Sequence, residues 1–449
     1  MPTAKIKNIS PARILIGSFL FVIAIGTILL SLPQARIVNI SFIDLLFTAA
    51  SSTCVTGLQV VPMSYFTFFG QCVVLSLIQI GGLGLMTLSF FLVSLIMNLR
   101  FITKLVAVQL LEFEFYNKIK TFLSLIIGLT FLSELIGAVA LYFPLSKIFS
   151  TKQAIFHAVF HSISAFCNAG TCLLDNSMSS YIRNASVLIP MSTLIFFGGI
   201  GFIVWYEIGT HILNRIKKTK TETKKLKFSL HTKIVLSTSF ILILIGGIFF
   251  MFLEKNNALG NLGAFHKIIN SIFMSVTTRT AGFSTTNVAH LSIPTLFIFI
   301  ILMFIGTSPT STGSGIKTTT FALFILTIVS FAKNKSSIEI FGRKIPASQI
   351  YKTTVVVALA LCWIGIATFF LLITDSNFSF IQILFESVSA FSTSGLSTGI
   401  TPYLSQAGKT LLVVTMLTGR IGSLTLVLAL TTRKEEQLYS YPEERVVIG

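Results

Sequence analysis

The residues of this chain whose types and spacing could do chemistry lie in four short segments with one repeated pattern. Each segment carries a phenylalanine, a Ser or Thr four residues later and a terminal glycine. The sets are Phe47, Ser51 and Gly57; Phe160, Ser164 and Gly170; Phe385, Ser389 and Gly395; and, with one residue deleted after the threonine, Phe273, Thr277 and Gly282. Polar loops often contain such residues, but four copies in register favour a repeated site. Glycine lets carbonyl oxygens aim at a common axis, and a ring of carbonyls can replace the hydration shell of an alkali cation.

Each terminal glycine and the two residues before it are therefore predicted to supply the carbonyls. These candidates are Val55, Thr56, Gly57, Asn168, Ala169, Gly170, Thr280, Ala281, Gly282, Thr393, Ser394 and Gly395. No acid occurs in the last few residues before any of the glycines, so no ring of carboxylates is needed. Asp44 and Glu386 lie earlier in two segments, where they either raise the local cation concentration or cap a helix. Arg279 is expected to point away from the cation path and to pair elsewhere.

A second unusual stretch interrupts a long apolar run at Gly306, Pro309, Gly313 and Gly315. Proline, glycine and many Ser and Thr residues cannot hold a lipid-facing helix. The alternative is a loop between two spans, but the apolar pieces on either side are too short to cross a membrane. We therefore predict an unwound segment inside the membrane. Lys317, just after it, either contacts this segment or anchors at the inner interface.

Arg420 is predicted to lie in the middle of the last apolar run. A central arginine costs about 2.5–3.5 kcal/mol on insertion scales, so a functional role is favoured. The alternative is a side chain that reaches the interface from a helix end. If Arg420 is central, it would form an electrostatic barrier that movement of the unwound segment relieves.

The elements that must position these residues follow from the pattern of apolar runs. Runs long enough to span a bilayer occur near 14–32, 70–97, 121–143, 186–213, 233–253, 292–330, 351–374 and 408–431. Between the members of each pair lies one short segment, at 40–57, 152–170, 263–282 and 378–395. We predict an all-α integral membrane protein with four pseudo-symmetric repeats of span, re-entrant pore helix and span around one central pore. The predicted repeats are 1–100, 101–218, 219–335 and 336–449, the last with a cytoplasmic C-terminal tail.

The composition excludes several classes of protein. Of the 449 residues 53% are hydrophobic and only 11% are charged, whereas about 25% are charged in an ordinary globular domain. The chain is therefore not a soluble enzyme, a disordered protein or a secreted disulfide module. The five cysteines are odd in number and have no CxxC spacing, so neither a disulfide framework nor a metal cluster is expected. The N-terminal run has no evident cleavage site and is predicted to be an uncleaved first span.

The positive charges predict the orientation of the chain. The net charge is +18, and of the 33 Lys and Arg residues 23 fall in the loops on the side of the termini against 8 on the other side. By the positive-inside rule both termini are cytoplasmic, in a multi-pass protein of the cytoplasmic membrane. The basic stretch 215–233 is then an inside loop near anionic lipid, or a docking site for a regulatory partner. Membrane topology explains the basic balance better than nucleic acid does.

The four glycine segments resemble those of the Trk/Ktr/HKT superfamily of potassium transporters. The similarity is close at Thr53-Cys-Val-Thr-Gly57-Leu, Phe166-Cys-Asn-Ala-Gly170, Thr278-Arg-Thr-Ala-Gly282-Phe-Ser-Thr and Phe391-Ser-Thr-Ser-Gly395-Leu-Ser. It extends nearly from end to end. The chain starts directly with the first repeat, without two extra N-terminal spans, and in this it looks like the KtrB branch.

The resemblance implies a function and partners. It implies potassium uptake through a selectivity filter, with the twelve carbonyl candidates as the only potassium site, and an intramembrane gating loop at the unwound segment near Arg420. It also implies a homodimer and a cytoplasmic KtrA-like ring of nucleotide-binding subunits, with sodium as an activator in some relatives. No nucleotide-binding motif occurs in this chain, so no cofactor is expected on it, and ATP or ADP is expected only on the partner. Thr310 and Ser314 stand where relatives often have glycine.

Two other functions compete with a pore. A symporter that couples sodium to potassium would use broken helices and a midplane ion site, and one broken helix is predicted here. Four glycine-ended segments favour the pore. An intramembrane enzyme is not expected, because the sequence has no HExxH, no GxSxG and no paired carboxylates on a span.

Overall fold

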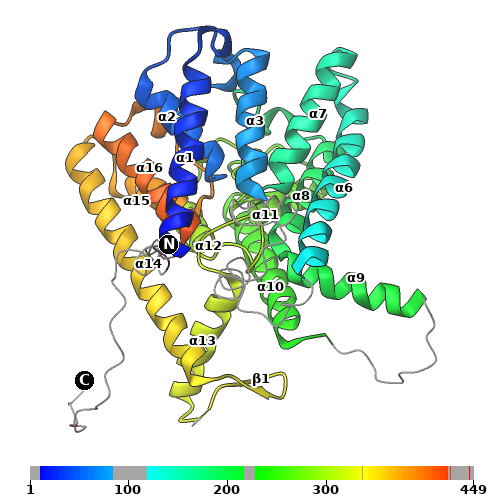
Figure 1. Cartoon of the computed structure of the whole chain (residues 1–449), viewed down its shortest axis with the longest axis vertical. Coiled ribbons are helices and arrows are strands. Elements are labelled where there is room, and N and C mark those ends of the chain that lie inside the picture. Colours follow the sequence, from blue (N-terminus) through cyan, green and yellow to red (C-terminus); the bar gives the residue numbers. More distant parts are fainter. Residues whose placement is uncertain are drawn as a thin grey trace, which may run out of the picture.

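A computed structural model describes residues 11–83, 119–216, 228–335, 337–422, 425 and 444 (Figure 1). Among these residues the fold is almost entirely helical, with one small hairpin. The second half of the predicted span 70–97, the end of the predicted span 408–431, most of the basic stretch 215–233 and most of the C-terminal tail lie outside the described residues.

The helices follow one order along the chain. The first quarter contains α1 (Pro11–Ser31), α2 (Phe42–Thr53) and α3 (Phe68–Gly82). The second contains α6 (Ile119–Leu145), α7 (Thr151–Phe166), α8 (Ala185–Ile200) and α9 (Phe202–Ile216). The third contains α10 (Leu230–Leu253), α11 (Ala264–Thr277), α12 (Ile293–Phe304) and α13 (Thr318–Ala332). The fourth contains the antiparallel pair β1 (Glu339–Ile340) and β2 (Arg343–Lys344), then α14 (Ala347–Thr374), α15 (Phe380–Ser392) and α16 (Gln406–Ile421).

Four short helices, α2, α7, α11 and α15, occupy the predicted short segments. The phenylalanine repeated in each of them is completely buried, and this explains why its position recurs. Each short helix packs between the two longer elements of its own quarter or beside the first of them. The helical nature of all four segments is therefore confirmed.

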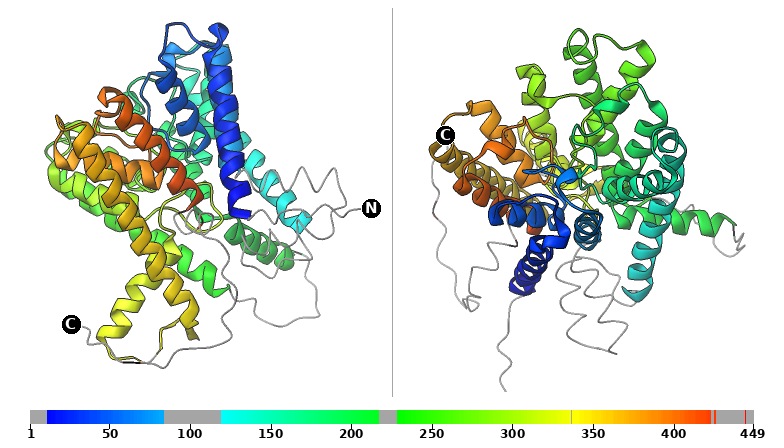
Figure 2. Two further views of the ribbon diagram at one scale, coloured as in Figure 1. Left: turned by 60° about the vertical axis from the view of Figure 1, so that its left-hand side comes forward. Right: turned by 90° about the horizontal axis from the view of Figure 1, so that it is seen from above.

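The quarters are joined in a closed ring. The helix after each short helix packs against the short helix of the next quarter: α3 against α7, α8 against α11, and α12 against α15. Helix α16 closes the ring by packing against α2 from the start of the chain. From above, the blue, cyan, green and orange parts follow one another around the middle of the molecule (Figure 2, right).

Glycines allow several of these helices to approach very closely. A Cβ added at Gly81, Gly198 or Gly419 would overlap the carbonyl oxygen of Thr53, Phe166 or Phe391, respectively. These three carbonyls belong to residues four before the terminal glycines of their loops. The same close packing therefore occurs at the end of α2, α7 and α15.

By length and composition, three described helical stretches could cross a membrane: Phe122–Leu145, Leu230–Leu253 and Ala347–Thr374. A fourth is reached if the bent pair Ala185–Ile200 and Phe202–Ile212 is counted as one. Shorter apolar helices occupy the described parts of the predicted spans 14–32, 70–97 and 292–330, and α16 occupies the described part of 408–431. The predicted break in the run 292–330 is confirmed, because no helix covers residues 305–317 between α12 and α13.

The predicted span at 186–213 is formed by two helices with a sharp bend between them. Helix α8 ends at Ile200, Gly201 has a φ of 100°, and α9 leaves at an angle of 97° (Figure 1). The cause is the close approach of the unwound segment, since a Cβ at Gly201 would overlap the carbonyl oxygen of Pro309. A left-handed backbone angle at this point favours glycine.

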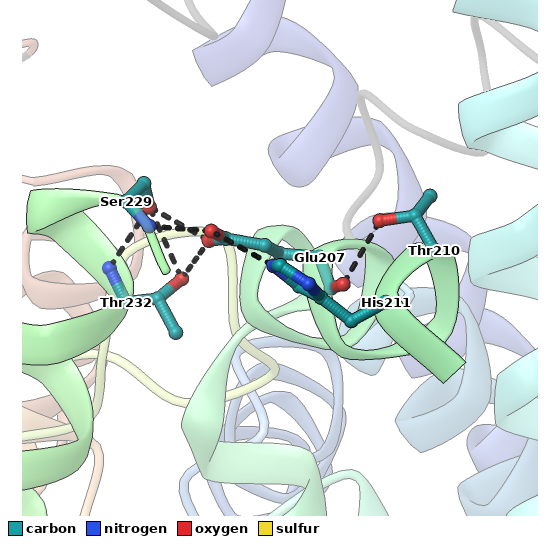
Figure 3. Close-up of polar contacts among 5 residues, drawn as sticks. All are labelled: Glu207, Thr210, His211, Ser229 and Thr232. Atoms are coloured by element: carbon teal, nitrogen blue, oxygen red, sulfur yellow. Dashed lines mark hydrogen bonds and ion pairs between the residues drawn. The ribbon is translucent and has the colours of Figure 1, made fainter. Parts of the chain in front are cut away.

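Helix α9 is tied to the start of α10 by one carboxylate (Figure 3). Glu207 accepts hydrogen bonds from the backbone N–H and the hydroxyl of Ser229 and from the hydroxyl of Thr232. Ser229 is itself the N-cap of α10, and His211 lies 3.8 Å from Glu207. The carboxylate therefore fixes the bent helix to the next quarter.

A second buried carboxylate performs a similar role just beyond the other end of α10. Glu254 accepts hydrogen bonds from the N–H and hydroxyl of Ser292 at 2.9 and 2.8 Å, from Thr295 at 2.6 Å and from Asn257 at 2.7 Å. Burial alone would raise the pKa of Glu254, but these hydrogen bonds outweigh it and hold the pKa below its usual value of 4.5.

A glycine substitution tests the close packing of the ring. Gly419→Ala is expected to destabilise the fold by about 1–3 kcal/mol, because the added Cβ overlaps the carbonyl of Phe391 on α15. Gly365→Ala on α14 is the matched control, since nothing lies within 4 Å of its Cβ, and it is expected to be neutral or stabilising. Thermal unfolding in detergent measures both. Equal stability of the two variants would contradict this account of the packing.

Glu254 gives an expected dependence of stability on pH. A carboxylate whose pKa is lowered in the folded state stabilises the fold above its usual pKa, and this contribution is lost as the pH falls through the folded value. Glu254→Gln is expected to unfold at a lower temperature than the unmodified chain at pH 7, with the difference shrinking below about pH 4.5. A difference that stays constant between pH 7 and pH 4 would exclude this role.

Candidate functional site

The four loops that follow the short helices share an alternating backbone. The residue two before each glycine has a positive φ: 59° at Val55, 58° at Asn168, 68° at Thr280 and 50° at Thr393. The glycines follow with φ values of 88°, 67°, 76° and 81°. A left-handed valine or threonine is a rare conformation that costs about 1–3 kcal/mol and is concentrated at functional sites. The surrounding structure therefore holds all four loops in an unusual form.

The four terminal glycines contact one another around a ring. A Cβ at Gly57 would overlap the carbonyl oxygen of Ala169 in the second loop. A Cβ at Gly170, Gly282 or Gly395 would likewise overlap the carbonyl oxygen of Ala281, Ser394 or Thr56, respectively. The carbonyl of the residue before each glycine thus faces the glycine of a neighbouring loop. The structure thus brings together the four loops that carry the twelve residues predicted to supply carbonyls.

Three of the four loops are held from behind by the repeated serine. The hydroxyls of Ser51, Ser164 and Ser389 donate to the carbonyls of Leu58, Thr171 and Leu396 at 2.8, 2.7 and 2.6 Å. In each case the acceptor is the residue directly after the glycine. The third loop, which is one residue shorter, has no such bond, because the Thr277 hydroxyl has no partner. The constant spacing between serine and glycine in the sequence is therefore the spacing that this hydrogen bond requires.

The short helices end at these loops. Helices α2, α7, α11 and α15 have their last residues at Thr53, Phe166, Thr277 and Ser392. The C-terminal end of a helix carries a partial negative charge, which favours a cation. The loops and the helix ends are therefore suited to the same kind of ion.

The unwound segment lies against both the second and the third loops. Its backbone bonds to the break between α8 and α9: Ser308 N–H donates to Gly199 at 3.1 Å, and Thr312 N–H donates to Gly198 at 3.2 Å. Phe202 N–H donates back to Thr310 at 3.0 Å. A Cβ at Gly313 would overlap the Thr280 hydroxyl of the third loop. The segment and the α8–α9 break thus satisfy each other's free backbone groups.

Three cations donate to carbonyls of this segment. Arg420 donates to the carbonyl of Thr312 and, at 3.2 Å, to the hydroxyl of Ser314. Lys317 donates to Gly313 at 2.8 Å, and Arg279 donates to Gly306 at 3.4 Å. Within the described part of the chain no carboxylate forms an ion pair with any of them. The predicted gating residues therefore lie together, with Pro309 and Gly315 in the same segment.

Arg420 also donates to the carbonyl of Gly81 on α3, so one guanidinium joins the unwound segment to the first quarter. Arg420 occupies the last turn of α16, which ends at Ile421, and Gly422 follows with a φ of 90°. Most of the predicted span beyond Gly422 lies outside the described residues, so the central place of Arg420 in that span stays a prediction.

Arg279 points away from the ring of glycines, as expected from the sequence. Its side chain is buried and donates to the hydroxyl and carbonyl of Ser239 on α10 at 3.2 and 3.5 Å. Of the two acids, Asp44 lies in the first turn of its helix beside the N-cap, as the capping alternative expects, whereas Glu386 caps no described helix. Asp44 pairs with Lys409 at 2.8 Å and bonds Ser41 at the start of α2, and Glu386 binds the chain after the fourth glycine.

Comparison with known proteins gives consistent results. The family model described as TrkH, cation transport protein, matches residues 8–440. The chain is 36% identical to the Ktr system potassium uptake protein B of Vibrio alginolyticus, over 99% of this chain and 96% of that protein. It is 37% identical to the Ktr system potassium uptake protein D of Bacillus subtilis, over 99% and 98%. It is 34% identical to the potassium/sodium uptake protein NtpJ of Enterococcus hirae, again over 99% and 98%.

The chain belongs to the TrkH family of cation transport proteins. The resemblance to the Trk/Ktr/HKT superfamily is thereby confirmed. Its fold matches the crystal structure of the potassium transporter TrkH from Vibrio parahaemolyticus with a TM-score of 0.71, over 96% of this chain and 86% of that one, at 18% identity. The relatives are ion transporters, and this supports the expectation that the chain is not an enzyme.

Sequence reasoning missed one polar cluster in this TrkH-family chain. Glu134 on α6 is buried, and its carboxylate accepts from the Gln79 amide on α3 at 3.2 Å. Cys167, the C-cap of α7, lies 3.8 Å from the same carboxylate. A lone acid in a long apolar run was the available signal, since such residues are rare in membrane spans.

The serine register gives a test within the site. Ser389→Ala is expected to destabilise the fold by about 1 kcal/mol, because the Leu396 carbonyl loses its donor. Thr277→Val, at the equivalent place in the third loop, is expected to cost less because the Thr277 hydroxyl has no partner. Thermal unfolding in detergent with and without potassium compares them. If Thr277→Val is as damaging as Ser389→Ala, the register has another cause.

Proposed function

We propose that this protein carries potassium into the cell across the cytoplasmic membrane, through a pore formed by the four loops. The observation that supports this most directly is the ring in which the carbonyl before each glycine faces the glycine of a neighbouring loop. Carbonyl rings of this kind coordinate dehydrated alkali cations. The relatives named as potassium uptake proteins favour potassium as the ion.

The proposed pore has four pseudo-symmetric repeats, each with a re-entrant short helix. The cyclic packing of α3 on α7, α8 on α11, α12 on α15 and α16 on α2 supports it. The carbonyls of the twelve predicted filter residues would replace the water around the ion. Both termini would lie in the cytoplasm, as the distribution of Lys and Arg favours.

The unwound segment is proposed as the gate. Gly306, Pro309, Gly313 and Gly315 lie in it, and Arg420 and Lys317 hold its carbonyls. The segment has few backbone hydrogen bonds of its own and is held by three cationic donors. It can therefore adopt a second arrangement when these donors release it. Opening would require Arg420 to release Thr312 and Ser314.

Partners are part of this proposal. The relatives are named as members of a Ktr system, which favours a membrane subunit that works with other subunits. We propose a homodimer in the membrane with a cytoplasmic KtrA-like ring that binds ATP or ADP, and sodium as an activator. The name potassium/sodium uptake protein of one relative favours sodium-coupled potassium symport as the second candidate function.

Flux measurements test the proposed pore. The purified chain in vesicles is expected to pass potassium in preference to sodium under an imposed voltage, and Gly57→Ser is expected to admit sodium, because a side chain at this position overlaps the Ala169 carbonyl in the ring. Gly365→Ala on α14 serves as the control that should keep the preference. Equal flux of both ions through the unmodified chain would refute the filter. Potassium flux that requires sodium on the same side would establish symport instead.

Arg420→Ala tests the gate. Loss of the bonds to Thr312, Ser314 and Gly81 is expected to raise potassium flux at least about tenfold. Arg183→Ala is the control. Arg183 is exposed, and it donates to the carbonyl of Asn261, which is more than 150 residues before Arg420 in the sequence. Flux that is unchanged at every potassium concentration would remove Arg420 from the gate.

A further inference from the structure

One position on the short helices carries a different side chain in every quarter. It follows the repeated phenylalanine directly and is occupied by Thr48, His161, Met274 and Glu386. All four lie beside the chain that leaves the glycine loop, and three of them bind it. The chemistry of the contact differs from one quarter to the next.

Glu386 forms the most extensive of these contacts. Its carboxylate is completely buried and has no cationic partner among the described residues. It accepts from Thr398 N–H at 2.8 Å, from the Ser397 hydroxyl at 2.7 Å and from the Thr401 hydroxyl at 2.8 Å. Thr398 is the third residue after Gly395. The carboxylate therefore binds the outgoing chain directly behind the fourth loop.

His161 makes the equivalent contact in the second quarter. Its Nε2 atom accepts from Leu173 N–H at 3.4 Å and lies 3.2 Å from the Cys172 sulfur. Leu173, like Thr398, is the third residue after its glycine. In the third quarter the Ser284 hydroxyl, two residues after Gly282, donates to the Met274 sulfur at 3.8 Å. Each of these side chains connects a short helix to the chain beyond its loop.

The first quarter lacks this connection. The Thr48 hydroxyl donates to the carbonyl of Asp44 in its own helix. A small void of about 10 Å³, roughly the room for one water molecule, lies beside it and is lined in part by Ser51, Gln59 and Thr171. The Gln59 amide nitrogen is buried there without a partner. Where the other quarters have a bracing side chain, the first has a water-sized void and an amide nitrogen without a partner.

We propose that Glu386 and His161 are positioning residues for ion selection, and that the first loop, which has no brace, is the deformable part of the filter. This rests on the proposed function. In the snug-fit account of selectivity, a carbonyl ring discriminates between ions of different size as far as its loops resist collapse around the smaller ion. A brace that binds the backbone after the glycine supplies that resistance.

The full chain in vesicles gives the test, with the ratio of potassium to sodium permeability as the readout. Glu386→Ala is expected to lower this ratio about tenfold, because four donors lose their acceptor. Glu386→Gln retains an oxygen for Thr398 N–H and is expected to stay within about twofold of the unmodified ratio. His161→Ala and His161→Gln form a second pair with the same expected order. If Glu386→Ala does not fold, the two His161 variants test whether a bracing contact supports ion selection.

Two controls match these variants. Thr48→Ala occupies the same position in the first quarter but breaks no contact with its loop, so the ratio is expected to be unchanged. Asp375→Asn removes a buried carboxylate that binds Ser405 at the start of α16 and none of the residues that Glu386 binds, and is expected to affect stability without affecting the ratio.

The outcomes are distinct. An unchanged ratio in both alanine variants overturns the proposal. If Glu386→Gln is as impaired as Glu386→Ala, the charge of the carboxylate and not its bracing contact is responsible, and the proposal is also overturned. An unmodified chain that does not prefer potassium refutes the proposed function itself.

Discussion

Free backbone carbonyls in an apolar surrounding need partners, and this requirement organises the whole structure. The chain leaves its helices at the four glycine loops, at the α8–α9 break and at the unwound segment. At each place other parts of the molecule supply the missing donors. Serine hydroxyls bind the carbonyls after the glycines, and Arg279, Arg420 and Lys317 bind those of the unwound segment. Irregular backbone persists at this depth only when it is enclosed in this way.

The same places depend on the absence of side chains. Gly81, Gly198 and Gly419 let helices touch the carbonyls at the ends of α2, α7 and α15. The loop glycines let carbonyls face one another around the ring. Glycine therefore serves two purposes here: it allows unusual backbone angles, and it lets one backbone approach another within contact distance. The two purposes are combined at Gly201, where the helix bends around Pro309.

The sequence was sufficient to predict the short helices, the loops and the break near Pro309, because the residues that determine them lie within each segment. The repeated phenylalanine and serine reflect burial and one hydrogen bond, both fixed by spacing within a segment. It was not sufficient to predict the bend at Gly201 or the partners of Arg420, since both depend on contacts with residues about one hundred positions away. The role of Glu386 could not be predicted for a similar reason. An acid on a short helix is compatible with capping and with ion attraction until its partners are known.

The ring closure has a consequence for how the protein is made. Helix α2 near the start of the chain finds its neighbour from the adjoining quarter only in α16, more than 350 residues later. During synthesis one side of α2 therefore stays without its packing partner until α16 has been made. Such long-range contacts form slowly, and incomplete chains expose surfaces that invite wrong partners. A truncated chain would lose more than its last helix, because the first loop would be left without one of its walls.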